Sequence, residues 1–131
     1  MAKAKAKPSL GLIEELMTEK SAVLSKAQAL TALEQTVQPL WASAAALEER
    51  IASLLDARGD DLEAAVHRIS AASCHEKAGD PSRAANLYQA ALAGPLREVT
   101  RKEVEGMLAA CLSRLKATAS GRKARRTASA S

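Results

Sequence analysis

The sequence contains few aromatic residues, cysteines, glycines and prolines, and each shortage removes a class of structure or site. Its 131 residues include one Trp, one Tyr, no Phe and six glycines. The glycines are isolated from one another, so no glycine-rich loop is available to cradle a phosphate group. Cys74 and Cys111 are the only cysteines, and we interpret them as free thiols in a reducing cytosol.

Long apolar runs and targeting signals are also missing. No stretch approaches the length of a membrane span, and no apolar segment follows the N-terminal lysines as it would in a secretory signal peptide. We therefore expect no membrane-spanning segment and a cytoplasmic location. In a eukaryote, the basic C-terminal segment would also suit a nuclear-import signal.

Recognisable catalytic and metal-binding motifs are absent as well. The soft metal ligands of the chain are His67, Cys74, His75 and Cys111, and their spacing matches no common zinc motif. No nucleophile motif frames the serines, and neighbouring acids such as Glu48 and Glu49 do not face each other on a helix. We therefore expect no enzyme, no metal site and no cofactor, and we interpret the cysteines as buried thiols and the imidazoles as partly exposed.

Alanine is the residue that the sequence has in excess. Hydrophobic residues make up 47% of the chain, and alanine, the strongest helix former, supplies much of that fraction. A chain of 131 residues suits a single domain. We predict an all-α protein, either an antiparallel helical bundle or a short α-solenoid, of about five to six helices.

Positive charge is concentrated at the two ends of the chain. Residues 1–8 contain three lysines, and the basic residues of the C-terminal segment are Arg122, Lys123, Arg125 and Arg126, with no acid in either place. Subtracting these seven charges from the net charge of +4 leaves −3 for the residues between them. We expect two disordered basic tails, 1–8 and 119–131, on either side of a helical domain at 9–118.

Apolar residues recur at helical spacing through the first half of the domain. The stripe steps by three and four residues, as in a heptad seam, through Leu30, Leu33, Val37, Leu40, Ala44, Leu47, Ile51 and Leu54. Pro39 interrupts this stripe, because a proline inside a helix removes a hydrogen bond and clashes with the preceding turn. We predict two helices that meet near Pro39, with Trp41 packing the corner between them.

Two glycine-aspartate pairs divide the following segment. Gly59 and Gly79 are predicted to end helices, because glycine adopts the left-handed conformation without penalty. Asp60 or Asp61, and then Asp80, are predicted to cap the helices that follow. The helix between the two glycines is expected to bury Leu62, Val66, Ile69 and Ala72 or Ser73.

The last helix is predicted to begin near Thr100. Thr100 and Glu103 match a capping box, and Val99 and Val104 match a hydrophobic staple across it. Its apolar face comprises Val104, Met107, Leu108, Cys111, Leu112 and Leu115. We expect the helix to fade near residues 117–121.

Residues 66–96 resemble one tetratricopeptide repeat, which is a pair of antiparallel helices joined by a turn that often contains Gly-Asp. The family's small and aromatic positions are matched by Ala72, Ala84, Tyr88 and Ala91. Arg68 and His75 stand where the family has large apolar or aromatic residues, and no second copy follows at the family's period of about 34 residues. The resemblance implies one helical hairpin rather than a repeat array. The three-helix microtubule-interacting and trafficking domain also uses a Leu-Tyr-x-x-Ala-Leu helix and is an alternative.

The resemblance implies a non-enzymatic protein-interaction module, such as an adaptor, a chaperone or an assembly subunit, that binds a partner peptide or helix. The candidate contact residues are Arg68 and His75 on the first helix of the hairpin and Arg83 and Asn86 on the second. The apolar stripe at 30–54 is the candidate for self-association, and its alternative use is an intramolecular core.

A second hypothesis is a small nucleic-acid- or ribosome-associated protein. In this case Arg122, Lys123, Arg125 and Arg126 would bind phosphate backbones. Binding would be weak, nonspecific and strongly salt-dependent, because no aromatic residue beside them can stack on bases. A salt titration of RNA or DNA binding, with and without residues 119–131, separates the two hypotheses.

Overall fold

The computed structural model describes residues 10–32 and 37–130 of the chain, with side chains at 10–30 and 37–121. Five helices follow one another in this part of the chain: α1 (Leu10–Ala32), α2 (Gln38–Ala57), α3 (Asp61–Lys77), α4 (Pro81–Leu92) and α5 (Glu98–Ala130). The described residues contain no strand. The predicted all-α class and helical-bundle architecture are therefore confirmed. None of the described helices is both long enough and apolar enough to cross a bilayer.

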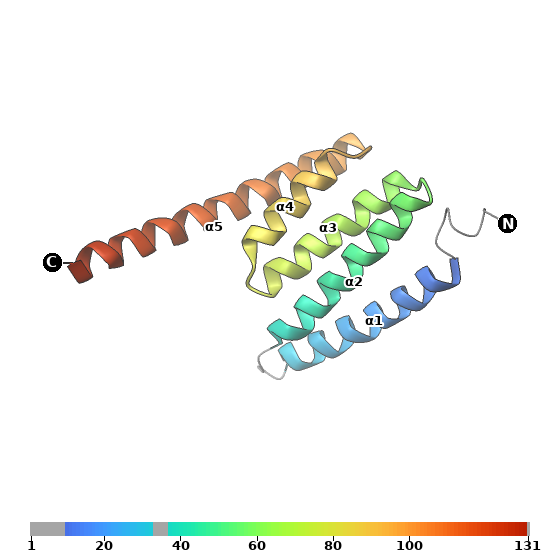
Figure 1. Ribbon diagram of the computed structural model, residues 1–131, viewed down its shortest axis with the longest axis horizontal. Helices are drawn as coiled ribbons and strands as arrows, with labels where there is room; N and C mark the ends of the chain where they lie inside the picture. The colour runs from blue at the N-terminus through green and yellow to red at the C-terminus, as the bar shows by residue number, and fades with distance from the viewer. Residues whose placement is uncertain (1–9, 33–36, 131) are drawn as a thin grey trace.

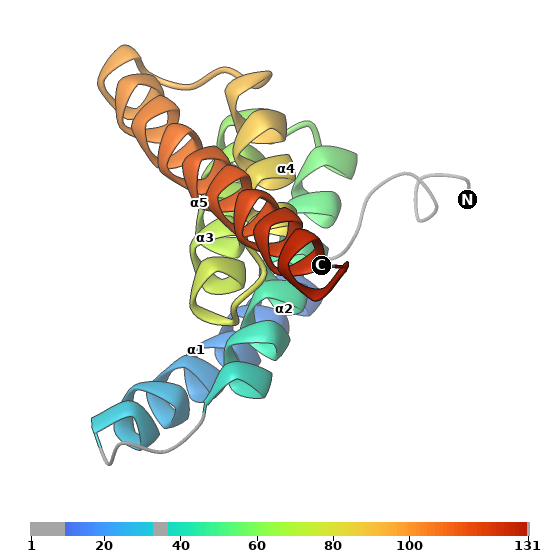
Figure 2. The same ribbon diagram turned by 90° about the vertical axis from the view of Figure 1, so that its left-hand side faces the viewer.

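The helices pack in chain order, each against the one before it (Figure 1). Short turns join α2 to α3 and α3 to α4, so these neighbours run antiparallel. α3 lies in the middle and has a neighbour on each side. The C-terminal half of α5 projects beyond the other helices (Figure 1), and in Figure 2 this end of α5 points toward the viewer.

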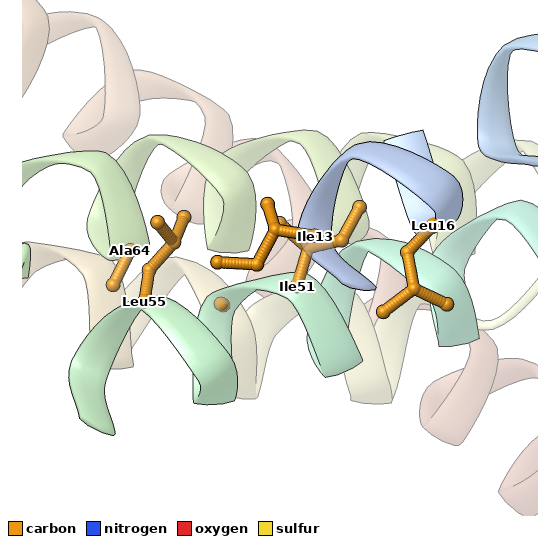
Figure 3. Close-up of a cluster of buried hydrophobic side chains, with 6 residues drawn as sticks. Ile13, Leu16, Ile51, Leu55 and Ala64 are labelled. Atoms are coloured by element: carbon orange, nitrogen blue, oxygen red, sulfur yellow. The ribbon is translucent and has the colours of Figure 1, made fainter. Parts of the chain in front are cut away.

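Three clusters of buried apolar side chains hold this array together. The first joins α1, α2 and α3 through Ile13, Leu16, Ile51, Leu55 and Ala64, which lie in one row in Figure 3. The second surrounds Trp41, which packs against α1 and α3 as its corner position predicted. The third surrounds Tyr88 and joins α3, α4 and α5. The apolar stripe of α2, including Ala44 and Ile51, is used inside the molecule.

The predicted helix boundaries hold at both glycine-aspartate pairs. Gly59 and Gly79 have φ angles of 83° and 84°, in the left-handed region that glycine adopts most easily. The Asp80 carboxylate accepts a hydrogen bond from the Arg83 backbone N–H at 3.1 Å, which caps α4. Asp60 occupies the equivalent position before α3, but its side chain makes no capping bond. Pro39 stands in the first turn of α2, where its missing N–H has no intrahelical acceptor.

The start and end of the last helix differ from the prediction. α5 begins at Glu98 rather than at Thr100, and Val99 is 72% exposed, so the predicted capping box and staple are wrong. A different contact holds the start of α5 to the end of α4: the Arg101 guanidinium donates to the Leu92 and Gly94 carbonyl oxygens at 2.6 and 2.9 Å. α5 then continues to Ala130, past the end expected near 117–121, because alanine, lysine and arginine favour helix there. Residues 1–8 lie outside the described part of the chain.

The buried face of α3 was also assigned wrongly by periodicity. Leu62 and Val66 are 39% and 42% exposed. Ala72 is buried as predicted, and the other small residues buried on this helix are Ala64, Ala65 and Ala71, beside the buried His67, Cys74 and His75. α3 packs between two helices that approach it closely, and small side chains permit that approach whereas larger ones would force the helices apart.

Candidate interaction site

Arg68 and His75, the two contact residues expected on the first helix of the hairpin, face α2. His75 is 4% exposed, and its Nε2 lies 2.8 Å from the Glu49 Oε2. Arg68, seven residues before His75 and so two turns away on the same face of α3, forms an ion pair with Asp56 of α2. These two pairs connect α3 to α2. His75 is therefore not available at the surface, and the expectation that both imidazoles are partly exposed is wrong, because His67 is buried too.

Arg83 and Asn86, the other two predicted contact residues, lie on the exposed side of α4. The Arg83 Nε lies 3.8 Å from the Asp80 Oδ2, in a pair that is mostly solvated. Within the described residues, no hydrogen bond or ion pair links this side of α4 to Arg68 or His75. Arg68 and His75 are therefore paired with α2, whereas Arg83 and Asn86 lie on the exposed side of α4. The side chains of Arg122, Lys123, Arg125 and Arg126 lie outside the described residues.

A buried charged group connects the first three helices. The Glu48 carboxylate is 1% exposed, and its Oε1 accepts from the Lys20 Nζ at 2.9 Å. The His67 Nδ1 lies 3.3 Å from the Glu48 Oε2. Burial alone would raise the pKa of Glu48, but the hydrogen bonds from His67 and Lys20 outweigh it and hold that pKa below its ordinary value. This group stabilises the packing of α1 and α3 on α2.

A second polar group connects the last three helices. The Tyr88 hydroxyl donates to the Glu76 carboxylate, which also pairs with Arg114 of α5. Burial, together with the bond to Glu76, raises the pKa of Tyr88. Burial also raises the pKa of Cys74 and of Cys111, which lowers the reactivity of both thiols.

The polar groups buried in the described part of the chain are therefore engaged in holding helices together. No buried side-chain nitrogen or oxygen there lacks a hydrogen-bond partner. Across the same residues, no group of three or more His, Cys, Asp and Glu side chains is arranged to hold a metal ion.

A shallow groove lies between the first turns of α3 and the start of α5. It has a volume of about 230 Å³ and is lined by Leu62, Glu63, Val66, Leu96, Arg97 and Thr100. Of the five large apolar side chains that are exposed in the described residues, two, Leu62 and Val66, line this groove. We call this surface the α3–α5 groove.

Two other hollows lie elsewhere on the surface of the described residues. One is lined by Gln28, Val37, Trp41 and Lys77 and has a volume of about 470 Å³. Trp41 is buried there, and the Lys77 Nζ lies over its ring at 4.4 Å from the centroid, which already occupies that face of the indole. The other lies where the turn at Gly79 meets α5. Among these three hollows of the described residues, the α3–α5 groove is the one lined by large exposed apolar side chains, Leu62 and Val66.

Sequence periodicity missed the groove because α3 carries two apolar stripes. Leu62 and Val66, four residues apart, form one stripe, and the buried alanines form the other. Large residues are usually taken as core, so the alanine stripe was given too little weight. Two apolar stripes on a central helix are the signal that one of them faces outward.

No family model, curated protein or solved structure matches this chain. The likeness of residues 66–96 to a tetratricopeptide repeat therefore stays a prediction. The function has to be argued from the groove itself.

Proposed function

We propose that this chain is a non-enzymatic helical interaction module that binds a helix or peptide of a protein partner in the α3–α5 groove. The observation that carries the proposal is the exposure of Leu62 and Val66 in a groove lined also by Leu96. Exposed apolar side chains that line one groove can act as contacts for a partner. Amphipathic helices commonly dock in such grooves through apolar side chains spaced by three or four residues.

The size of the groove favours side-chain anchors over a small-molecule ligand. Its volume of about 230 Å³ lies below the roughly 300–1,000 Å³ typical of small-molecule sites. Glu63 and Arg97 at its border add one charge of each sign, which can orient a bound segment. The use of the buried polar side chains in interhelical contacts supports a role without chemistry.

The test compares the proteins bound by three forms of the chain. Val66→Glu places a charge in the groove, whereas Leu112→Glu makes the same kind of change at a site of similar exposure, 46%, outside it. Each form is immobilised, incubated with lysate of the organism that encodes it, and the bound proteins are quantified by mass spectrometry.

We expect specific proteins to be retained by the wild type and by Leu112→Glu and lost with Val66→Glu. Circular dichroism checks that both variants keep the wild-type helix content. Equal retention by Val66→Glu and the wild type would contradict the assignment of binding to the groove. Retention of no specific protein by any form would contradict a role in binding other proteins.

A further inference from the structure

The two charges at the border of the α3–α5 groove have no partner within the described residues. Glu63 belongs to the first turn of α3, and Arg97 immediately precedes α5. Neither takes part in an ion pair with any described residue, although ion pairs connect several other helix surfaces. The groove therefore presents one acid and one base on opposite walls, with apolar side chains between them.

This arrangement is self-complementary. In a two-fold symmetric pair, the same surface of each copy contacts that of the other, so a contact of one residue with a second residue of the partner is repeated with the two copies exchanged. When the two-fold axis runs along the groove, the wall that carries Glu63 faces the partner's wall that carries Arg97. The apolar residues Leu62 and Val66 then face the partner's Leu96.

We infer that the occupant of the α3–α5 groove is a second copy of this chain, forming a two-fold symmetric dimer with two reciprocal Glu63–Arg97 pairs. The inference rests on the proposed function, because it names the partner of the same groove. The apolar stripe of α2, the sequence-based candidate for self-association, is not available for this role, because Ala44 and Ile51 are fully buried within the molecule.

The test uses charge reversal in the full chain, measured by sedimentation velocity over a concentration series. Wild type is expected to reach twice the chain mass of 13.7 kDa. Glu63→Arg and Arg97→Glu each place like charges at both reciprocal contacts. Each is expected to weaken the dimer by about tenfold or more, since like charges across an interface oppose association. Glu105→Arg, at an exposed position of α5 that does not line the groove, is the control for net charge and is expected to leave the dimer unchanged.

The double variant E63R/R97E decides between a second copy and a different partner. In a two-fold dimer it restores both pairs with reversed polarity, so the dimer is expected to regain its wild-type affinity. An unaltered foreign partner would instead meet two wrong charges. Failure of the double variant to recover, when both single variants weaken the dimer, would overturn the charge pairing.

Two further results would overturn the inference. One is a wild-type chain that stays monomeric at every concentration. The other is a dimer that Val66→Glu leaves intact, because such a dimer would use another surface. A monomeric chain that still captures a protein in a Val66-dependent way would overturn the second-copy inference and leave the proposed function standing, so the two failures are distinguishable.

Discussion

Replacement of Glu48 by glutamine removes the charge from the most buried acid of the described chain while keeping its shape. The carboxylate is 1% exposed and is held by the Lys20 Nζ at 2.9 Å and the His67 Nδ1 at 3.3 Å. Removing one member of a buried ion pair costs about 3–5 kcal/mol when the other charge stays buried. The Lys20 side chain is 20% exposed and can be hydrated in the variant, so we expect Glu48→Gln to cost less, about 2–3 kcal/mol.

Thermal unfolding followed by circular dichroism measures this loss. For a chain of this size, 1 kcal/mol corresponds to a shift of about 4 °C in Tm, so the variant is expected to unfold about 8–12 °C below the wild type at pH 7. Glu105→Gln, at an exposed position, is the matched control and should change the free energy of unfolding by less than about 0.5 kcal/mol. Equal Tm values for Glu48→Gln and the control would refute the stabilising role of this buried group.

The stabilisation that Glu48 provides is expected to decrease in acid. The pKa of Glu48 in the folded protein lies below its ordinary value of 4.5. The unfolded chain therefore takes up a proton at Glu48 more readily than the folded chain does. The stabilisation is fully present above pH 4.5 and is lost as the pH falls through the folded-state pKa. The difference in Tm between wild type and Glu48→Gln should therefore shrink in acid, and a constant or growing difference would contradict the cited pKa direction.

Three further predictions concern packing, backbone conformation and thiol reactivity. Ala84→Leu overfills the contact of α4 with its neighbours and should cost about 1–3 kcal/mol, whereas Ala42→Leu at an exposed position should cost little; equal Tm losses would show that the alanines do not set the helix spacing. Gly79→Ala should lower the free energy of unfolding by about 1–2 kcal/mol, because its φ of 84° strains an alanine. Gly106→Ala inside α5, where an added Cβ meets open space, should raise it by about 0.5–1 kcal/mol. Chemical denaturation of the two variants should therefore show changes in the free energy of unfolding of opposite sign. Cys74 and Cys111 should react with a thiol reagent at pH 8 much more slowly in the folded protein than in denaturant, and equal rates would contradict their burial.

The helical class and the helix boundaries at Gly59, Gly79 and Pro39 were accessible from the sequence because they depend on local chemistry. The left-handed glycines Gly59 and Gly79, the cap at Asp80 and the early position of Pro39 in α2 each act within one turn. The packing of Trp41 near the junction of α1 and α2 was also predicted, because a large amphipathic side chain beside a helix break usually packs against the adjoining helix.

The groove and the polar contacts could not be predicted in the same way because they depend on which helices become neighbours. His75 looked like a surface residue until α2 supplied Glu49 as its partner. Leu62 and Val66 looked like core until α3 was found to pack through its alanines. The start of α5 was misplaced because Arg101, rather than a capping box, satisfies the carbonyl groups at the end of α4.

The central claim, that the α3–α5 groove is an interaction surface, is tested most directly by hydrogen exchange of the backbone amides in the associated state. Association is expected to slow exchange in the first turns of α3 and at the start of α5 around Thr100, and to leave the exposed side of α4 around Arg83 unchanged. Val66→Glu is expected to abolish this slowing under the same conditions. Slowed exchange around Arg83, with no change at the start of α3 or α5, would contradict the assignment of this groove as an interaction surface.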